Sequence, residues 1–346
     1  MESQDQLVGG QEHMPSRSSA TRTEQSDLPQ GPVVVLGEAM HLFVAEPGVS
    51  FARADHFRTG VAGAETNVAV GLSRLGHHTR WLGRLGHDPS GEAVLRRLRA
   101  EAVDVSVVQL DESRPTGVLL RDSHAERAVT VQYHRAGSAA TALDAKYVEH
   151  HWPQDAALAH VTGITAMLSE SSRGAVGMLA DCAARTGSVL SFDLNLRRKL
   201  GQLDKWREHT ARALSSADIV FAGEDELEAV TDRPAPSVAD QLLAGSASAV
   251  VIKHRDRSCT VATHQGTWNE VSRVRRVVDP VGAGDALSAG FLSAWLRGRD
   301  PHECLVTAVE AAAWVVGATL DHDGMPDRPQ LLRAFDTALE ADEVDR

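Results

Sequence analysis

The sequence predicts an α/β fold in which a mostly parallel sheet is covered by helices on both faces. From residue 32 onward, short apolar runs of strand length alternate with longer segments whose apolar residues recur at helical spacing. Two stretches, residues 40–57 and 116–133, interrupt this alternation with strand-like pieces that no helix separates. Extra strands of this kind often form a flap over the site of an α/β domain.

The individual elements follow from the same patterns, taken in chain order. We expect strands at residues 33–36, 79–86 (with a turn), 159–161, 188–192, 219–222, 249–253 and 275–279. We expect helices at residues 64–75, 91–102, 170–185, 205–214, 237–244, 286–297 and 301–320. The segments TGVLLRD and RAVTVQY are expected to form a hairpin around residues 123–126.

Residues 1–30 differ in character from the rest of the chain. They are polar, show no periodicity, and lack the apolar segment of a signal peptide. This composition predicts a disordered tail. The chain has three cysteines, far apart and odd in number, without a CxxC pair. We therefore expect thiols in a reducing cytoplasm rather than disulfides or a zinc site.

Charge and hydropathy exclude two classes of partner. The formal net charge is −12, and no basic run or basic-aromatic stripe is present, so we expect no nucleic-acid partner. No apolar run approaches the length of a membrane span, so we expect no membrane partner. An acidic chain that binds an anion has to use local arginines or backbone N–H groups.

The segment VVDPVGAGDALSAGF carries the clearest chemical signal. Residues 282–284 are small and precede a predicted helix, where glycine allows an anion to approach backbone N–H groups and the helix dipole favours negative charge. Asp285 would repel that anion, so its carboxylate makes sense as a base for a hydroxyl that attacks a phosphoryl group. GxGD alone is also compatible with a tight turn and helix cap. The Walker A and GxGxxG patterns are absent.

Three segments together resemble the PfkB, or ribokinase-like, carbohydrate kinases. They are GVAGAETNVAVGLSRLG (residues 60–76), WLGRLGHDPSGE (residues 81–92) and the VVDPVGAGDALSAGF segment, in the order found in that family. The resemblance spans roughly residues 32–333. It implies one kinase domain over residues 31–346, a ribokinase-like doubly wound sheet, and a small β lid from residues 40–57 and 116–133. Phosphorylation of a sugar hydroxyl would use ATP and Mg²⁺, with Asp285 as the base and Gly282, Ala283 and Gly284 as the anion hole.

Finer features resemble the 2-keto-3-deoxygluconate kinases within this family. VQYHRAGSAATAL (residues 131–143) carries their Tyr-x-Arg, and SFDLNLRRKL (residues 191–200) carries their Asp-x-Asn-x-Arg. Two arginines suit a sugar acid, because the planar guanidinium binds a carboxylate through two hydrogen bonds. The resemblance implies product phosphorylated at the 6-position. The substrate contacts expected from it are Gly63, Ala64, Asn67, Tyr133, Arg135, Arg197 and Asp321.

The expected nucleotide and metal residues include departures from the family pattern. Asn195, Lys253, Arg255, Gly282 and Gly284 are expected to bind ATP. Arg255 and Ser258 stand where the family has glycines, which serve a turn with positive φ. Glu226 is the expected metal residue, but Gly223 replaces the asparagine usual in that motif. The acidic residues 224–226 also suit a first helical turn.

Other functions stay open on sequence grounds. A related kinase for ribose, fructose, another sugar acid or a nucleoside such as adenosine shares the same motifs. A degenerate kinase that only senses a sugar or nucleotide is motivated by the altered turn and Gly223, although the intact Asp285 argues against it. A homo-oligomer joined through the lid strands is compatible with the resemblance, because it would cover their open edges.

Overall fold

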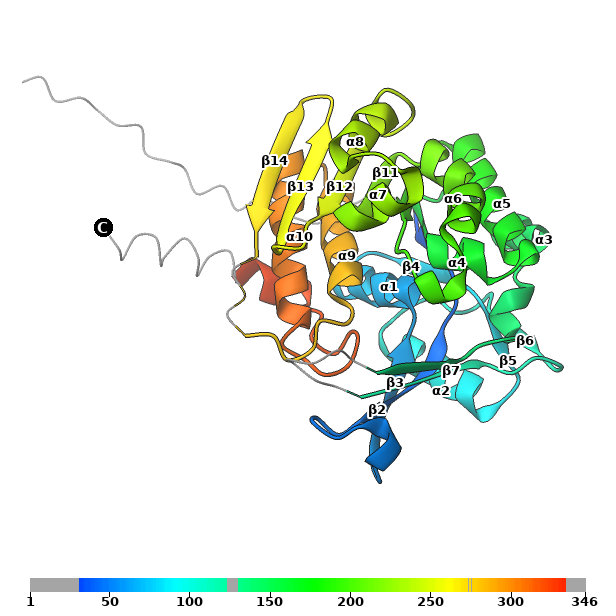
Figure 1. The fold of residues 1–346 in the computed structure, drawn as a ribbon. Helices are drawn as coiled ribbons and strands as arrows, with labels where there is room; N and C mark the ends of the chain where they lie inside the picture. The colour runs from blue at the N-terminus through cyan, green and yellow to red at the C-terminus, as the bar shows by residue number, and fades with distance from the viewer. Residues whose placement is uncertain (1–30, 123–129, 273, 275, 334–346) are drawn as a thin grey trace, which may run out of the picture.

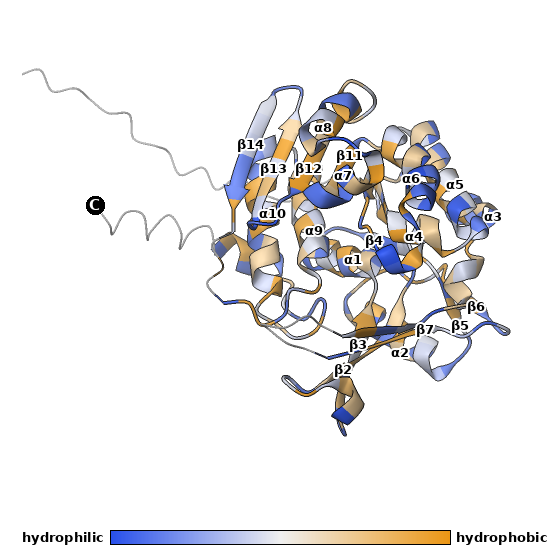
Figure 2. Cartoon of the chain, in the orientation of Figure 1, coloured by the Kyte–Doolittle hydropathy of each residue, from blue (hydrophilic) through white to orange (hydrophobic). Residues whose placement is uncertain are grey.

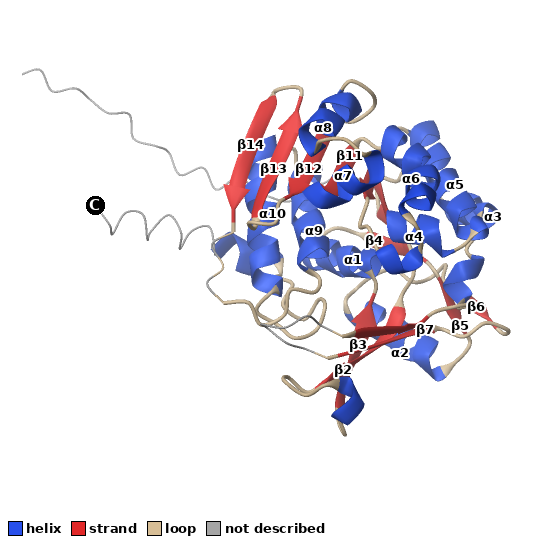
Figure 3. Cartoon of the chain, in the orientation of Figure 1, coloured by secondary structure: helices blue, strands red, loops and turns tan. Residues whose placement is uncertain are grey.

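The computed structural model describes residues 31–122, 130–272, 274 and 276–333. The predicted tail at residues 1–30 and the expected hairpin turn lie outside this range. A main sheet of eight strands runs through the molecule with helices on both sides, and a smaller four-stranded sheet lies at one end (Figures 1 and 3). The arrangement is the α/β class that the alternating pattern predicts.

The main sheet has the order β14-β13-β12-β11-β10-β9-β1-β4. Its strands are β1 (Val33–Leu36), β4 (Thr79–Leu82), β9 (Leu158–Thr162), β10 (Val189–Asp193), β11 (Ile219–Gly223), β12 (Ala249–Lys253), β13 (Ser258–Thr263) and β14 (Gly266–Val271). Neighbours pair in parallel from β4 to β12, whereas β13 and β14 pair antiparallel. The edge strand β14 is mostly hydrophilic, as suits a strand with one open edge (Figure 2).

Alternating side chains of each central strand feed two separate cores. Val33 and Val35 of β1 pack on one face, and Val34 and Leu36 pack on the other. Helices α1 (Ala64–Arg74), α2 (Pro89–Ala100), α9 (Ala283–Leu296) and α10 (Pro301–Val315) cover the first face. Helices α3 (Ala145–His151), α4 (Gly163–Leu168), α5 (Glu170–Thr186), α6 (Leu203–Ser216), α7 (Glu224–Thr231) and α8 (Ala235–Leu243) cover the second. The sheet is therefore doubly wound.

The smaller sheet, here called the lid sheet, has the order β3-β2-β7-β8. Its strands are β2 (Met40–Ala45), β3 (Phe57–Ala62), β7 (Gly117–Arg121) and β8 (Val131–His134). The antiparallel pairing of β7 with β8 confirms the two predicted hairpin strands. Short η1 (Phe51–Arg53) precedes β3, and a separate pair joins β5 (Arg84–Gly86) to β6 (Gln109–Asp111). The other 3-10 turns are η2 (Ala139–Ala142) and η3 (Arg198–Leu200).

The strand predicted at residues 275–279 is wrong. The described part of this segment makes no strand ladder, because the N–H groups of Val278 and Asp279 both donate to the carbonyl of Val316. The helix predicted at residues 301–320 is also too long, because α10 ends at Val315. The carbonyl that accepts these two hydrogen bonds belongs to the next residue, Val316. Strands β13 and β14 and helices α3 and α4 are additions that the sequence reading missed.

None of the helices in the described residues combines the length and hydropathy that a bilayer span requires.

Candidate active site

Most of the predicted site residues line one cavity of about 410 Å³. It lies at the carboxyl ends of the central parallel strands, where ligands of open α/β sheets bind. Met40 and Leu119 of the lid sheet form part of its wall. The predicted residues that line it are Gly63, Ala64, Asn67, Tyr133, Arg135, Asn195, Arg197, Glu226, Lys253, Gly282, Gly284, Asp285 and Asp321. We call this space the acceptor cavity.

Asp285 lies buried in the first turn of α9. Asn67 of α1 donates a hydrogen bond from Nδ2 to its Oδ2 at 2.7 Å. Burial raises the pKa of Asp285 to about 7, and the Asn67 hydrogen bond opposes the shift. A carboxyl group with this pKa accepts a proton near neutral pH, as a general base must.

The loop before α9 approaches the cavity closely through glycine. Gly282 is in the left-handed region with φ 85°, and a Cβ at this position would lie 2.1 Å from the carbonyl oxygen of Asp321. No other residue fits there without moving the backbone. Ala283 is not brought into the acceptor cavity: its N–H donates to the carbonyl of Pro280 at 3.3 Å. Of the three residues expected to form an anion hole, Gly282 and Gly284 line the acceptor cavity.

Arg135 already has an acidic partner inside the cavity. Its guanidinium forms an ion pair with Glu38, which follows β1, and Ser138 donates to the other oxygen of Glu38 at 2.7 Å. The guanidinium also lies 5.6 Å from the ring centroid of Tyr133. Arg197 differs, because it is exposed and its guanidinium donates only to the carbonyl of Leu196, at 3.2 Å, among the described contacts. Arg197 is thus the less compensated cation.

Sequence reasoning missed a buried arginine that joins the lid sheet to the anion-hole loop. Arg121, at the end of β7, is 1% exposed and donates to Asp279 at 2.5 Å and to Asp321 at 3.0 Å. Burial raises the pKa of Asp321, although Arg121 opposes the shift. The local pattern GVLLR does not distinguish a buried arginine from a surface one, so no signal in the sequence pointed to this role.

Glu65 of α1 was also missed. Its Oε1 accepts hydrogen bonds from the Thr162 N–H and the hydroxyls of Thr162 and Thr165, and burial raises its pKa. Its Oε2 has no partner within the described structure. The same is true of three other buried atoms, Asn67 Oδ1, Arg121 Nε and Arg135 Nε, which belong to residues of the cavity wall. Buried polar atoms are normally satisfied, so these four are candidates for contact with a polar ligand.

A charged cluster lies at the ends of β10 and β12. Lys253 Nζ donates to both carboxylate oxygens of Asp193, at 3.1 and 2.9 Å. Burial alone would lower the pKa of Lys253, but Asp193 and Glu226 outweigh it and raise the pKa overall. Glu226 accepts from the N–H of Gly223 at 2.9 Å, and burial raises its pKa. Asn195, with φ 42°, follows Asp193 and completes the cluster.

This cluster fits nucleotide-bound Mg²⁺. No three His, Cys, Asp or Glu side chains gather into a metal cage within the described ranges. Mg²⁺ does not require one, because it is commonly held by one or two carboxylates together with phosphate oxygens. Glu226, which lines the acceptor cavity, supplies one such carboxylate.

A second cavity of about 420 Å³ adjoins the first and shares Lys253, Pro280 and Gly284 with it. We call it the nucleotide cavity. Its wall includes the apolar side chains Val274, Val277, Ala283, Leu287, Val309, Ala312 and Val316. Arg257 also lines it and holds φ 70°, so a non-glycine residue takes the left-handed position of the altered turn. The structure does not bring Arg255 into either cavity; its side chain is 81% exposed and pairs with Asp225.

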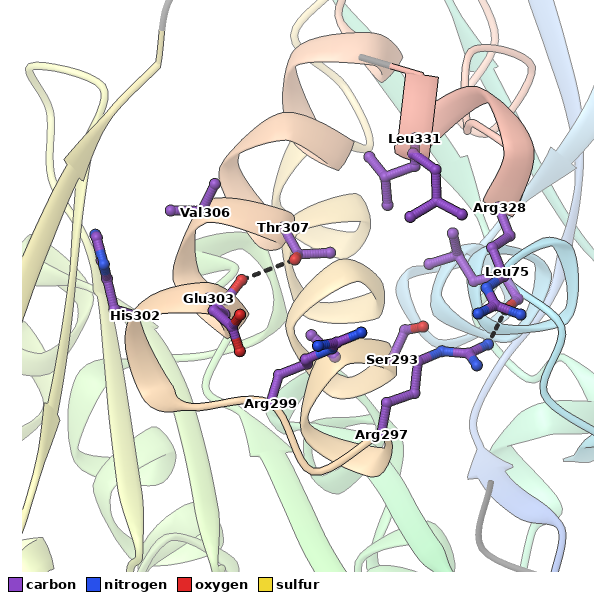
Figure 4. Close-up of a pocket in the computed structure, with 12 residues that line it drawn as sticks. Leu75, Ser293, Arg297, Arg299, His302, Glu303, Val306, Thr307, Arg328 and Leu331 are labelled. Carbon is purple, nitrogen blue, oxygen red and sulfur yellow. Dashed lines mark hydrogen bonds between the residues drawn. The ribbon is translucent and has the colours of Figure 1, made fainter. Parts of the chain in front are cut away.

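A third cavity, of about 370 Å³, lies between the end of α9 and the start of α10 (Figure 4). Arg297 on its wall donates to the carbonyl of Leu75 at 2.7 Å. None of the predicted site residues lines this cavity, which lies at the end of α9 opposite Asp285. The chemistry is therefore assigned to the two adjoining cavities.

Comparison with known proteins agrees with this geometry. The model of the pfkB family carbohydrate kinases matches residues 31–328. A 2-dehydro-3-deoxygluconokinase of Bacillus subtilis is 35% identical over 303 residues, covering 86% of this chain and 93% of its own. A 2-dehydro-3-deoxygalactonokinase of Haloferax volcanii is 33% identical over 286 residues, covering 81% and 89%.

Among solved structures, a PfkB protein from Polaromonas sp. JS666 is similar, with a TM-score of 0.77 and 32% identity. It covers 87% of this chain and 99% of its own. The glycine-bounded loop, the buried Asp285 and the lid sheet all lie within the residues that the family model matches. The chain belongs to the pfkB family of carbohydrate kinases, and it is an enzyme that uses ATP to phosphorylate a sugar.

Proposed function

We propose that this kinase phosphorylates 2-keto-3-deoxygluconate on its 6-hydroxyl. The observation that carries the proposal is Arg197, which lines the cavity of Asp285 and lacks a carboxylate partner among the described residues. A substrate carboxylate supplies that partner, whereas a neutral sugar leaves the guanidinium unused. The Bacillus relative named for this substrate supports the choice.

Arg135 has a different role in this proposal from Arg197. Because Glu38 already compensates its charge, Arg135 adds little attraction for a second carboxylate. Its buried Nε, which lacks a partner in the described structure, is suited to donate to the keto or carboxylate oxygen of the acid. Tyr133 stacks against the same guanidinium and keeps it in place.

The remaining buried polar atoms suit the hydroxyl groups of the substrate. Glu65 Oε2 and Asn67 Oδ1 accept hydrogen bonds, and Arg121 Nε donates one. A sugar acid with hydroxyls along its chain satisfies such atoms, while an analogue without them leaves buried groups unpaired and binds poorly. Gly63 and Ala64 form the adjoining wall, and Asp321 lies beside Arg121.

Proton and charge movement follow from the geometry. Asp285 takes the proton of the attacking hydroxyl, and Asn67 holds the carboxylate in position with its 2.7 Å hydrogen bond. The N–H groups at Gly282 and Gly284 face the charge that develops on the transferred phosphoryl group. The lid sheet limits the access of water, which reduces hydrolysis of ATP.

The nucleotide cavity is the proposed site of the adenine and ribose of ATP. Lys253 lines both this cavity and the acceptor cavity, Asn195 lines the acceptor cavity, and both would contact the phosphates. Glu226 would hold Mg²⁺, which neutralises phosphate charge when bound. Arg255 is left out of this assignment because it faces solvent.

Two further expectations, on oligomeric state and on location in the cell, remain proposals. A homo-oligomer formed through the lid sheet would cover the open edges of β3 and β8. We place the protein in the cytoplasm, where the buried free thiols Cys182, Cys259 and Cys304 would remain reduced.

The test is an ATP-consumption assay with purified protein, Mg²⁺ and a panel of acceptors. The panel holds 2-keto-3-deoxygluconate, 2-keto-3-deoxygalactonate, gluconate, ribose, fructose and adenosine, and NMR of the product locates the phosphate. Turnover confined to the keto-deoxy acids, with phosphate at the 6-position, is the expected result. Preference for a neutral sugar would be consistent with kinase activity but would overturn the proposed contact of Arg197 with a substrate carboxylate.

A second candidate substrate is the galactonate epimer, which differs in the configuration at one carbon. The Haloferax relative carries that name, at an identity close to that of the Bacillus relative. The ratio of kcat/KM for the two epimers in the same assay decides between them.

A further inference from the structure

Lys253 occupies the point where the two cavities meet. It ends β12, and it lines both the acceptor cavity and the nucleotide cavity. Its Nζ lies 3.6 Å from the position that a Cβ would take on Gly284, so the ammonium group is next to the anion-hole loop. A phosphoryl group that moves from nucleotide to sugar has to cross this junction.

The carboxylate of Asp193 fixes the ammonium group of Lys253 at this junction. Both oxygens of Asp193 accept from Nζ, and Asp193 is almost completely buried. The side chain of Lys253 is still 22% exposed, toward the cavities that it lines. Its third N–H is therefore available to a ligand while the other two fix its position.

We propose that Lys253 is a catalytic residue whose ammonium group contacts the phosphoryl group during its transfer, with Asp193 as the residue that positions it. The inference rests on the proposed function, in that it assumes ATP in the nucleotide cavity. The sugar O–P bond forms as the bond between the γ-phosphorus and the bridging oxygen of ATP breaks. Asp285 receives the hydroxyl proton, and ADP leaves. Lys253 remains an ammonium ion throughout and neutralises charge on the transferred group.

The competing explanation is that Lys253 only compensates the buried charge of Asp193. A residue of that kind contributes to folding and to the shape of the site, and its loss should be harmless once Asp193 is neutral. A residue that stabilises the transition state remains necessary whether or not Asp193 is charged. A double-mutant cycle separates these cases.

The experiment compares Lys253→Met, Lys253→Arg, Asp193→Asn and the double variant K253M/D193N with the wild type. The matched control is Lys146→Met, an exposed lysine at the start of α3. Steady-state kinetics give kcat and both KM values, and calorimetric titration gives the Kd of ATP. Thermal unfolding shows that each variant is folded. The acceptor is whichever panel sugar the wild type phosphorylates best, so failure of the gluconate assignment leaves this test intact.

We expect K253M to lower kcat about 100-fold or more, with the Kd of ATP changed less than about fivefold. K253R should recover part of the lost kcat. In the D193N background, K253M should still lower kcat at least about tenfold. The proposal is overturned if D193N abolishes the effect of K253M. It is equally overturned if K253M raises the KM of ATP while kcat stays unchanged, since Lys253 would then bind the ground state only.

Discussion

The two adjoining cavities are built from different kinds of side chain. The acceptor cavity is lined by buried charges and polar atoms, several of them without a partner in the described structure. Much of the nucleotide cavity is a wall of valine, alanine and leucine. Unpaired buried polar groups discriminate strongly against a ligand that cannot satisfy them, whereas apolar walls discriminate weakly. Selectivity in this enzyme should therefore reside on the sugar side.

The largest effect is expected from removing Asp285, the proposed base. Asp285→Asn should lower kcat by about two to four orders of magnitude, because the amide of asparagine cannot accept the hydroxyl proton as a carboxylate does. The Kd of ATP should change little, since Asp285 lines only the acceptor cavity. Steady-state kinetics with calorimetric titration of ATP test both statements, and turnover close to wild type would remove Asp285 from this role.

The same variant has a stability signature. The folded-state pKa of Asp285 lies above its ordinary value, so the folded protein binds more protons between about pH 4 and 7, and this group costs stability as pH rises through that window. D285N should therefore unfold at a higher Tm than the wild type at pH 8, by a few degrees. The difference should shrink toward pH 5.

The pH dependence of the wild type follows from the same carboxyl group. Because burial raises the pKa of Asp285 to about 7, the base is increasingly protonated below that pH. We expect kcat/KM to fall about tenfold per pH unit from pH 7 to pH 5 and to level off above about pH 8. A profile flat down to pH 5 would show that the base titrates elsewhere.

The carboxylate contact is expected to give a smaller effect. Arg197→Met should raise the KM of the keto-deoxy acid about 10- to 100-fold, the worth of a charge-assisted hydrogen bond, and leave the KM of ATP nearly unchanged. Arg198→Met is the matched control, since Arg198 is the exposed neighbour and lines neither cavity. Equal effects of the two substitutions would contradict the assignment.

The smallest effect is expected on the apolar side. Val277→Ala removes two methyl groups from a half-buried wall of the nucleotide cavity and should raise the KM of ATP about two- to fivefold, with kcat unchanged. Val271→Ala, at an exposed position of β14, is the control. If the KM of the sugar changed as much as the KM of ATP, the assignment of separate ligands to the two cavities would be contradicted.

The sequence predicted features that contiguous residues encode, and it did not predict contacts between residues that are distant in the chain. The strands 33–36 and 249–253 and the glycine loop before Asp285 are encoded by contiguous residues, and the structure describes those strands with the same bounds. The pairing of Arg135 with Glu38 joins β8 to the end of β1 and has no local signal.

Tertiary contacts also explain the strand that was predicted and is absent. Residues 277–278 have the β-branched character of a strand, yet the N–H of Val278 bonds to the end of α10, and Asp279 bonds to Arg121. Conversely, the sequence did not predict β13 and β14, although they pair locally as a hairpin that closes between Thr263 and Gly266. Long-range partners decided only the first case.

The strand pairing of the lid sheet has a consequence for how the chain folds. Its central pair, β2 with β7, is parallel, and α1, β4, β5, α2 and β6 lie between these strands in the chain. The ion pairs of Arg121, at the end of β7, form with Asp279 and Asp321, which lie 158 and 200 residues further along the chain. Contacts so distant in sequence form slowly. The lid sheet should accordingly be the last part of the protein to acquire protection from hydrogen exchange during refolding, after the core that it covers.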